Sequence, residues 1–213
     1  MLVSQLVDQV PRALLPKEST LQDGVDLVWQ HPQVLAELGE LLAVLDDLVD
    51  HVHERLPGRP DVPLLVHARY TRLEILSAFG RGTGPRVDTW QSGVMWMEDE
   101  QADLFAVTFD KLAYGFSPTT RYRDYAVSPE LFHWESQSAT RADSPTGRRY
   151  QEHEERGSEV LIFARLDVSD RAFWCLGPAV YVDHEGERPM AINWRLQFPL
   201  PGDLFTQFAA AVA

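Results

Sequence analysis

The sequence has a single cysteine, Cys175, and therefore cannot form an internal disulfide bond, which is typical of a protein from a reducing compartment. Residues 1–10 contain no basic side chain and include Asp8, so we expect no cleaved leader peptide. No apolar run reaches the ~18 residues of a membrane span. The longest candidate, residues 34–52, is interrupted by five acidic residues. These absences predict a soluble, cytoplasmic protein.

The motifs of common catalytic sites are also absent. The sequence contains no GxxxxGK[ST] or GxGxxG loop for phosphates, no GxSxG nucleophile elbow and no CxxC pair. His51 and His53 are two residues apart on a predicted helix and would point to different faces, and His184-Glu185 lacks the second histidine of an HExxH motif. We therefore expect no metal, no cofactor and no catalysis by this chain.

The net charge of −13 argues against DNA binding by charge alone, because contacts to phosphates need Lys and Arg. The charge is distributed unevenly. Residues 1–60 hold ten acidic and four basic side chains, a charge of −6, whereas residues 111–149 hold four acidic and six basic ones, a charge of +2. Five of those six are Arg, which binds phosphates as a planar fork. A local basic face on an acidic protein is thus predicted.

Residues 31–56 have apolar side chains at three- and four-residue steps and acidic side chains between them, which predicts a long helix that ends at Pro57-Gly58. Thr71 and Glu74 have the spacing of a capping box and predict a second helix that ends near Gly80. The chain is therefore divided into a helical lead-in, residues 1–60, and a second domain, residues 61–213.

Strand patterns dominate the second domain. The predicted strands are residues 64–66, 93–97, 104–109, 133–138, 159–166, 173–176, 180–183 and 191–198. Ser128-Pro129 predicts a short helical turn, Ser144-Pro145 a helix that runs to Arg156, and residues 201–212 a final helix. Residues 159–166 are the best candidate for a central strand. The predicted fold class is α+β, with a curled, mostly antiparallel sheet or small barrel and flanking helices; a parallel doubly wound sheet is disfavoured.

Residues 122–150 combine aromatic rings, arginines, amides and carboxylates, the groups that hold a nucleobase by stacking and edge hydrogen bonds. Such rings also fill ordinary protein cores. The candidates for base binding are Tyr122, Asp124, Tyr125, Trp134, Ser136 and Gln137, and those for phosphate binding are Arg121, Arg123, Arg148 and Arg149. Alternation along a strand would turn Tyr122 and Asp124 to one face and Tyr125 to the other.

Two alternatives stay open. Asp124 is followed by Glu135 and Gln137, an acidic residue and then ExQ, and metal-dependent nucleases gather carboxylates in this way. The acidic helix of residues 31–56 could instead dock on another protein, which would make the chain a protein-interaction module.

Several segments resemble, in order, an uncharacterised domain at the C-terminal end of bacterial superfamily-II helicases, many of which carry an N-terminal phospholipase-D-type nuclease. The matching segments are residues 67–72, 79–80, 116–120, 122–138, 144–150, 176–179 and 185–190. Together they span about residues 63–201. The segments are long, so the resemblance is specific.

The resemblance implies a role that composition does not. Some helicases of this architecture are similar to modification-dependent (type IV) restriction enzymes, which act in antiviral defence. Their C-terminal part is thought to recognise methylcytosine in the manner of base-flipping SRA and PUA-like domains. The implied partners are double-stranded DNA with a modified cytosine and helicase and nuclease domains in cis or in trans. Motor and nuclease residues belong to those other domains.

Overall fold

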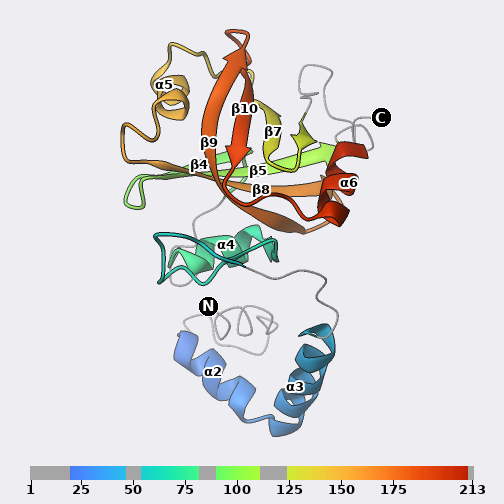
Figure 1. Ribbon diagram of the computed structural model, residues 1–213. Helices are drawn as coiled ribbons and strands as arrows, with labels where there is room; N and C mark the ends of the chain where they lie inside the picture. Colours follow the sequence, from blue (N-terminus) through green and yellow to red (C-terminus); the bar gives the residue numbers. More distant parts are fainter. Residues whose placement is uncertain (1–19, 47–53, 82–89, 111–123, 211–213) are drawn as a thin grey trace.

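The computed structural model describes residues 20–46, 54–81, 90–110 and 124–210 (Figure 1). The helices are α2 (Leu21–Trp29), α3 (Pro32–Asp46), α4 (Arg72–Ala78), α5 (Pro145–Gln151) and α6 (Gly202–Ala210). The strands are β1 (Glu54–Arg55), β2 (Leu65–Val66), β3 (Arg69–Thr71), β4 (Val94–Met97), β5 (Ala102–Asp110), β6 (Tyr125–Ser128), β7 (Leu131–Glu135), β8 (Glu159–Asp167), β9 (Ala172–Glu185) and β10 (Ala191–Leu196).

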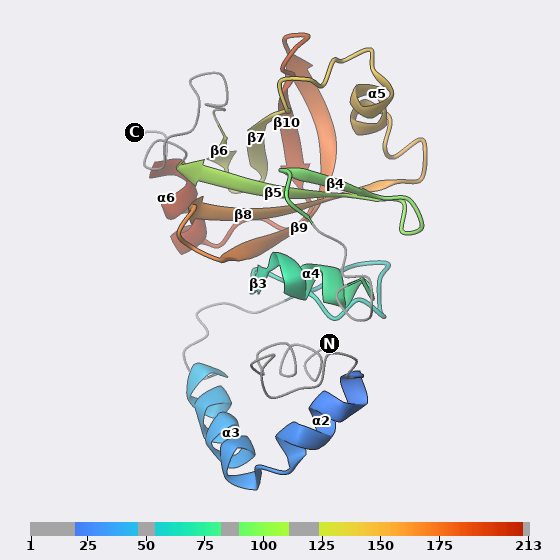
Figure 2. The same ribbon diagram turned by 180° about the vertical axis from the view of Figure 1, so that it is seen from behind.

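One large sheet organises the described residues. Its strand order is β4-β5-β8-β9-β10-β7-β6, and β3 adds a further pairing to β9. All of these pairs are antiparallel except β5 and β8, which run parallel. The predicted α+β fold with a mostly antiparallel sheet is confirmed, and residues 159–166 form the expected central strand. The sheet is curled but open rather than a closed barrel (Figure 2).

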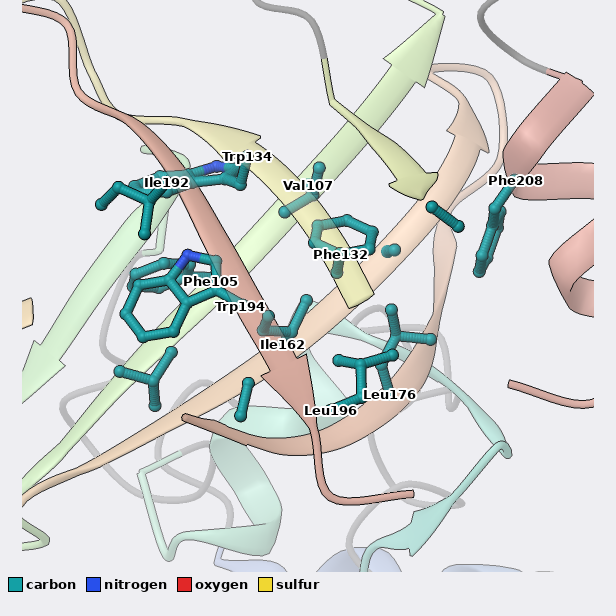
Figure 3. Packing of buried hydrophobic residues seen from close by; sticks show 14 of the residues in the cluster. Phe105, Val107, Phe132, Trp134, Ile162, Leu176, Ile192, Trp194, Leu196 and Phe208 are labelled. Atoms are coloured by element: carbon teal, nitrogen blue, oxygen red, sulfur yellow. The ribbon is translucent and has the colours of Figure 1, made fainter. Parts of the chain in front are cut away.

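The inner face of the curl holds the larger core, here called the interior cluster. Strand β5 contributes Phe105, Val107 and Phe109 to this face, and their neighbours Leu104 and Ala106 face the opposite side. Figure 3 shows rings and aliphatic chains from β5, β7, β8, β9, β10 and α6 meeting here. The labelled members are Phe105, Val107, Phe132, Trp134, Ile162, Leu176, Ile192, Trp194, Leu196 and Phe208. The sheet thus wraps around its own side chains.

The outer face carries a second core beneath α4. The helix begins at the capping box of Thr71 and Glu74 and buries Ile75 and Leu76 against the sheet. Leu56 belongs to the same core, and β1 pairs with β2. Residues 54–56 therefore pack with the second predicted domain, and the division of the chain at residue 60 stays a prediction.

Two helix predictions were wrong. Glu54 and Arg55 form β1 rather than the end of a helix from residue 31, because their backbone pairs with β2. The segment after Ser128 is a hairpin turn between β6 and β7 rather than a helical turn. The Ser128 hydroxyl accepts hydrogen bonds from the backbone N–H groups of Glu130 and Leu131, so the same cap chemistry closes a hairpin here.

Two boundaries also differ from the predicted ones. Residues 173–176 and 180–183 belong to one strand, β9, because Gly177 adopts a positive φ of 83° beside the irregular pairing at Ile162 and lets the strand continue. Helix α5 ends at Gln151, and turns continue to Gly157.

Helices α2 and α3 form a hairpin that precedes the sheet in the chain (Figure 1). A capping box between Thr20 and Asp23 begins α2. Several large apolar side chains of this hairpin are exposed: Trp29, Val34, Leu41, Leu42 and Val44. In the parts of the chain that the structure describes, no helix is both long and apolar enough to cross a bilayer.

Candidate functional site

The curl of the sheet brings β5 and β7 together, although three strands separate them in the sheet order. The rings of Phe105 and Trp134 lie 4.3 Å apart, and those of Phe109 and Phe132 lie 5.8 Å apart. The pairing of β4 with β5 extends only as far as Gly93, the residue before β4. The Gly93 carbonyl accepts a hydrogen bond of 2.7 Å from the Ala106 N–H. Beyond this point the described residues place no strand beside the outer edge of β5. We call this junction of β5 with β6 and β7 the seam.

A cavity of about 540 Å³ lies at the seam. Its apolar wall includes Ala106, Val107 and Trp134. The polar side chains that line it are Arg72, Gln91, Thr108, Asp124, Glu135, Gln137, Ser138 and Arg165. Carboxylates, amides and guanidinium groups thus meet around one apolar surface. These groups can donate hydrogen bonds to a polar ligand and accept hydrogen bonds from it.

Asp124 is held in place by the backbone of the neighbouring strand. It directly precedes β6 and is only 4% exposed. Its Oδ1 accepts a hydrogen bond of 3.0 Å from the backbone N–H of Glu135. This bond ties β6 to the end of β7 and fixes the carboxylate at the cavity wall.

Trp134 and Gln137 reach the cavity from β7 and the turn that follows it. Trp134 is 5% exposed and packs on Phe105 and Tyr150, so most of its ring belongs to the interior cluster. Gln137 is exposed, and its carbonyl accepts from the Thr140 N–H at 2.8 Å in a tight turn. Three of the predicted base-binding residues, Asp124, Trp134 and Gln137, therefore line one cavity.

Two other predicted base-binding residues lie elsewhere, and Tyr122 lies outside the described residues. Tyr125 alternates with Asp124 on the strand and stacks on His133, with ring centroids 4.8 Å apart. Ser136 is fully buried and is not part of the cavity lining. Its N–H donates to the Met190 carbonyl at 2.8 Å, and its hydroxyl accepts from the Met190 N–H at 2.9 Å.

Of the predicted phosphate-binding residues, the two that the structure describes, Arg148 and Arg149, do not line the cavity. Arg121 and Arg123 lie outside the described residues, and Arg148 is exposed on α5. Arg149 donates two hydrogen bonds to the Asp103 carboxylate, from Nε at 2.7 Å and from Nη2 at 2.9 Å. Its guanidinium carbon lies 4.2 Å from the centroid of the Trp96 ring. Burial raises the pKa of the Asp103 carboxyl, and the Arg149 guanidinium opposes that rise. Arg149 is thus engaged in a largely buried ion pair.

Sequence reasoning missed Arg72, Arg165, Gln91 and Thr108. Arg72 is the first residue of α4, and Arg165 follows the apolar run of β8, so a charged residue at the end of a buried strand was an available signal. Asp124 and Glu135, the residues of the nuclease alternative, both line the cavity. Within the described ranges, no cluster of three or more His, Cys, Asp or Glu residues has a geometry suited to a metal ion.

The solved structures that match this chain at low identity include two DNA complexes and one restriction enzyme. The SUVH5 SRA–fully methylated CG DNA complex matches with 12% identity and a TM-score of 0.44, over 71% of this chain and 100% of that one. The SUVH5 SRA–methylated CHH DNA complex matches with 12% identity and a TM-score of 0.42, over 71% and 99%. The 5-hydroxymethylcytosine-specific restriction enzyme AbaSI matches with 10% identity and a TM-score of 0.34, over 87% and 58%.

No curated protein matches the sequence significantly. Residues 64–208, well over half of the chain, match a family described as a domain of unknown function, DUF3427. This match runs from β2 into α6 and includes the large sheet and every residue of the cavity. The chain therefore belongs to the DUF3427 family.

Proposed function

We propose that this domain binds double-stranded DNA that carries a modified cytosine, and that the flipped base enters the cavity at the seam. The observation that carries the proposal is the meeting of Asp124, Gln137 and the Trp134 ring around one cavity of about 540 Å³. This volume lies within the roughly 300–1,000 Å³ of small-molecule sites. The resemblance of the sequence to modification-dependent restriction proteins points to the same ligand.

The side chains match the edge of cytosine. A flipped cytosine presents an exocyclic amine that donates and a ring nitrogen and carbonyl that accept. The Asp124 carboxylate accepts, and the Gln137 amide can both donate and accept. The cavity wall formed by Ala106, Val107 and Trp134 is apolar and suits a methyl group. Burying one methyl group contributes about 1 kcal/mol, which corresponds to about fivefold, so the expected preference for methylated DNA is below about tenfold.

The proposed role is binding without chemistry. The domain would recognise modified DNA, while helicase and nuclease domains in cis or in trans would act on it. This division of labour is what the resemblance implies.

A titration with two duplexes of one sequence, with and without 5-methylcytosine, tests the proposal. Asp124→Asn keeps an oxygen for the Glu135 N–H but removes the charge that accepts from cytosine. We expect Asp124→Asn and Gln137→Ala to lose the preference for the modified duplex. Tyr125→Phe, a change on the other side of β6, is the control and should retain it. If both cavity variants remain folded and discriminate as the parent does, the cavity is not the base site.

Base flipping has a separate readout. With 2-aminopurine placed beside the modified cytosine, extrusion of the cytosine unstacks the probe and raises its fluorescence. Binding without any rise in fluorescence would leave a DNA reader that does not flip its base.

The nuclease alternative draws support from the position of Asp124 and Glu135 on the same cavity. Supercoiled plasmid incubated with the protein and Mg²⁺ or Mn²⁺ decides between the two functions. Intact plasmid agrees with a binding module. Cleavage that disappears in Asp124→Ala or Glu135→Ala would establish a nuclease.

A second candidate function is docking of the α2–α3 hairpin on a helicase. The observation that favours it is the set of exposed apolar side chains on these helices, among them Trp29, Leu41 and Leu42. A docking module would bind a purified superfamily-II helicase in the absence of DNA and would lose binding in Leu41→Ser/Leu42→Ser. The two functions are compatible, because they use different parts of the chain.

A further inference from the structure

A second cavity, of about 450 Å³, adjoins the first. Arg72 and Arg165 line both cavities, so the two spaces share a wall. Thr71, Leu73, Arg171 and Phe173 complete the lining of the second cavity. Three of its six lining residues are arginines and none is acidic. The second cavity is therefore the more basic of the two.

The arrangement of Arg72 and Arg165 is fixed by contacts to an aromatic ring and to neutral oxygens. Both guanidinium groups lie over the Phe173 ring, Arg165 at 4.4 Å and Arg72 at 5.5 Å from its centroid. Arg72 Nη1 donates to the carbonyls of Trp90 and Gln91 at 3.1 and 3.4 Å. Arg165 Nε donates to the Thr108 hydroxyl at 2.9 Å, and its Nη1 donates to the Asp170 carbonyl.

Most of the other arginines of the described chain are paired with a carboxylate. Six of them form ion pairs with carboxylates: Arg59, Arg69, Arg81, Arg141, Arg149 and Arg156. Among the described residues, no carboxylate oxygen lies within 4 Å of the guanidinium nitrogens of Arg72, Arg165 or Arg171. Nε of Arg72 is buried and finds no hydrogen-bond partner in the same part of the chain.

The electrostatics of the pair are unfavourable without an anion. Burial lowers the pKa of the Arg72 guanidinium, and the charge of Arg165 lowers it further. Burial also lowers the pKa of the Arg165 guanidinium. The carboxylates of Asp170 and Asp167 raise this pKa and offset only part of the lowering. Two partly buried like charges repel each other, and an anion between them relieves both the repulsion and the desolvation.

We infer that Arg72, Arg165 and Arg171 form a phosphate-binding subsite, which takes the backbone phosphodiester next to the flipped nucleotide. This inference rests on the proposed function and deepens it. A nucleotide presents a base and a phosphate side by side, and the two adjoining cavities offer acceptors for the one and guanidinium forks for the other. The phosphate contacts thus come from β8, α4 and the turn before β9 rather than from the arginines around residues 121–149.

Arg171→Gln is the main test, because Arg171 is exposed and its replacement should not disturb folding. Arg165→Gln is the second variant, and Arg195→Gln, an exposed arginine that lines neither cavity, is the charge-matched control. We expect each of the first two to weaken binding about tenfold for modified and unmodified duplex alike, as loss of one charged hydrogen bond predicts. The slope of log affinity against log salt should fall by about one. The control should show neither effect.

A second arm separates this inference from the proposed function. Millimolar pyrophosphate should raise the melting temperature of the parent and of Arg195→Gln, and this stabilisation should be lost in Arg171→Gln and Arg165→Gln. That result supports the subsite even if the parent shows no preference for modified DNA, in which case only base reading fails. If Arg171→Gln and Arg165→Gln match the parent in DNA affinity, salt dependence and response to pyrophosphate, the subsite assignment is wrong, whether or not the protein reads modified DNA.

Discussion

The ring of Trp134 on β7 packs on the ring of Phe105 on β5, with centroids 4.3 Å apart and planes inclined by 36°. The two strands are separated by β8, β9 and β10 in the sheet, so this contact exists only because the sheet curls back on itself. It joins the two sides of the seam directly beside the cavity. The same side chain therefore stabilises the curl and forms the apolar wall of the candidate site.

Trp134→Ala should lower the free energy of unfolding by about 3–5 kcal/mol, because it opens a cavity in the interior cluster. Trp134→Phe keeps a ring against Phe105 and should cost clearly less. Urea denaturation followed by circular dichroism measures both. Trp29→Ala, a change at a side chain that is 56% exposed, is the control and should stay within about 0.5 kcal/mol of the parent. A loss below about 1 kcal/mol for Trp134→Ala would contradict the packing role.

Ser136→Ala should destabilise the fold without changing base preference. The substitution leaves the buried N–H of Met190 without its 2.9 Å acceptor, which costs about 1–3 kcal/mol. Thr206→Ala, which removes an exposed hydroxyl, should be close to neutral. Denaturation curves and the ratio of affinities for modified and unmodified duplex are the two measurements. A changed affinity ratio at unchanged stability would instead indicate that Ser136 takes part in base binding.

Gly147→Ala should be among the most damaging single changes in the chain. A Cβ at this position would lie 2.1 Å from the Arg141 carbonyl oxygen and 2.8 Å from that of Ala142, so the backbone itself must move. Gly202→Ala is the matched control, because a Cβ there meets nothing within 4 Å. Thermal melts should show a large loss for Gly147→Ala and none for Gly202→Ala. Equal melting temperatures would show that the 141–147 turn adapts.

The free energy of unfolding should decrease at alkaline pH. Burial raises the pKa of the Cys175 thiol from its ordinary 9.0 to about 12, and burial also raises the pKa of the Tyr150 hydroxyl. Between pH 9 and 12 the unfolded chain loses these protons while the folded chain keeps them. The stabilisation is therefore fully present below pH 9 and is lost as the pH rises through the folded-state pKa.

Denaturation midpoints measured from pH 7 to 11 test this expectation. Cys175→Ala and Tyr150→Phe should each flatten the alkaline decline, and the native thiol should resist a disulfide reagent at pH 8 until the protein unfolds. Rapid labelling of the native thiol would mean that Cys175 is accessible.

Local signals in the sequence were enough for elements with local causes. The capping box at Thr71 and Glu74 fixed the start of α4, and the apolar run after Glu159 marked the central strand β8. Residue types alone also singled out Asp124, Trp134 and Gln137, which line one cavity. What these cases share is that the deciding interaction lies within a few residues or depends only on residue type.

Other features depend on partners far away in the sequence. Arg149 was predicted to bind phosphate. In the structure its guanidinium group forms an ion pair with Asp103 on β5, and no local sequence pattern predicts that pairing. Ser136 bonds to Met190 only because β7 and β10 lie side by side. Arg72 and Arg165 come from α4 and β8 and meet over Phe173 of β9. Such juxtapositions follow from the sheet order, which periodicity does not specify.

The parallel pairing of β5 with β8 has a kinetic consequence. Ala102 is aligned with Glu159, more than fifty residues later, and β6, β7 and α5 all lie in the loop that this pairing closes. Closing so long a loop carries an entropic cost before any contact repays it, which slows folding. The cavity residues Asp124, Trp134 and Gln137 lie inside that loop, so the candidate site should assemble in one late, cooperative step rather than as an independent hairpin.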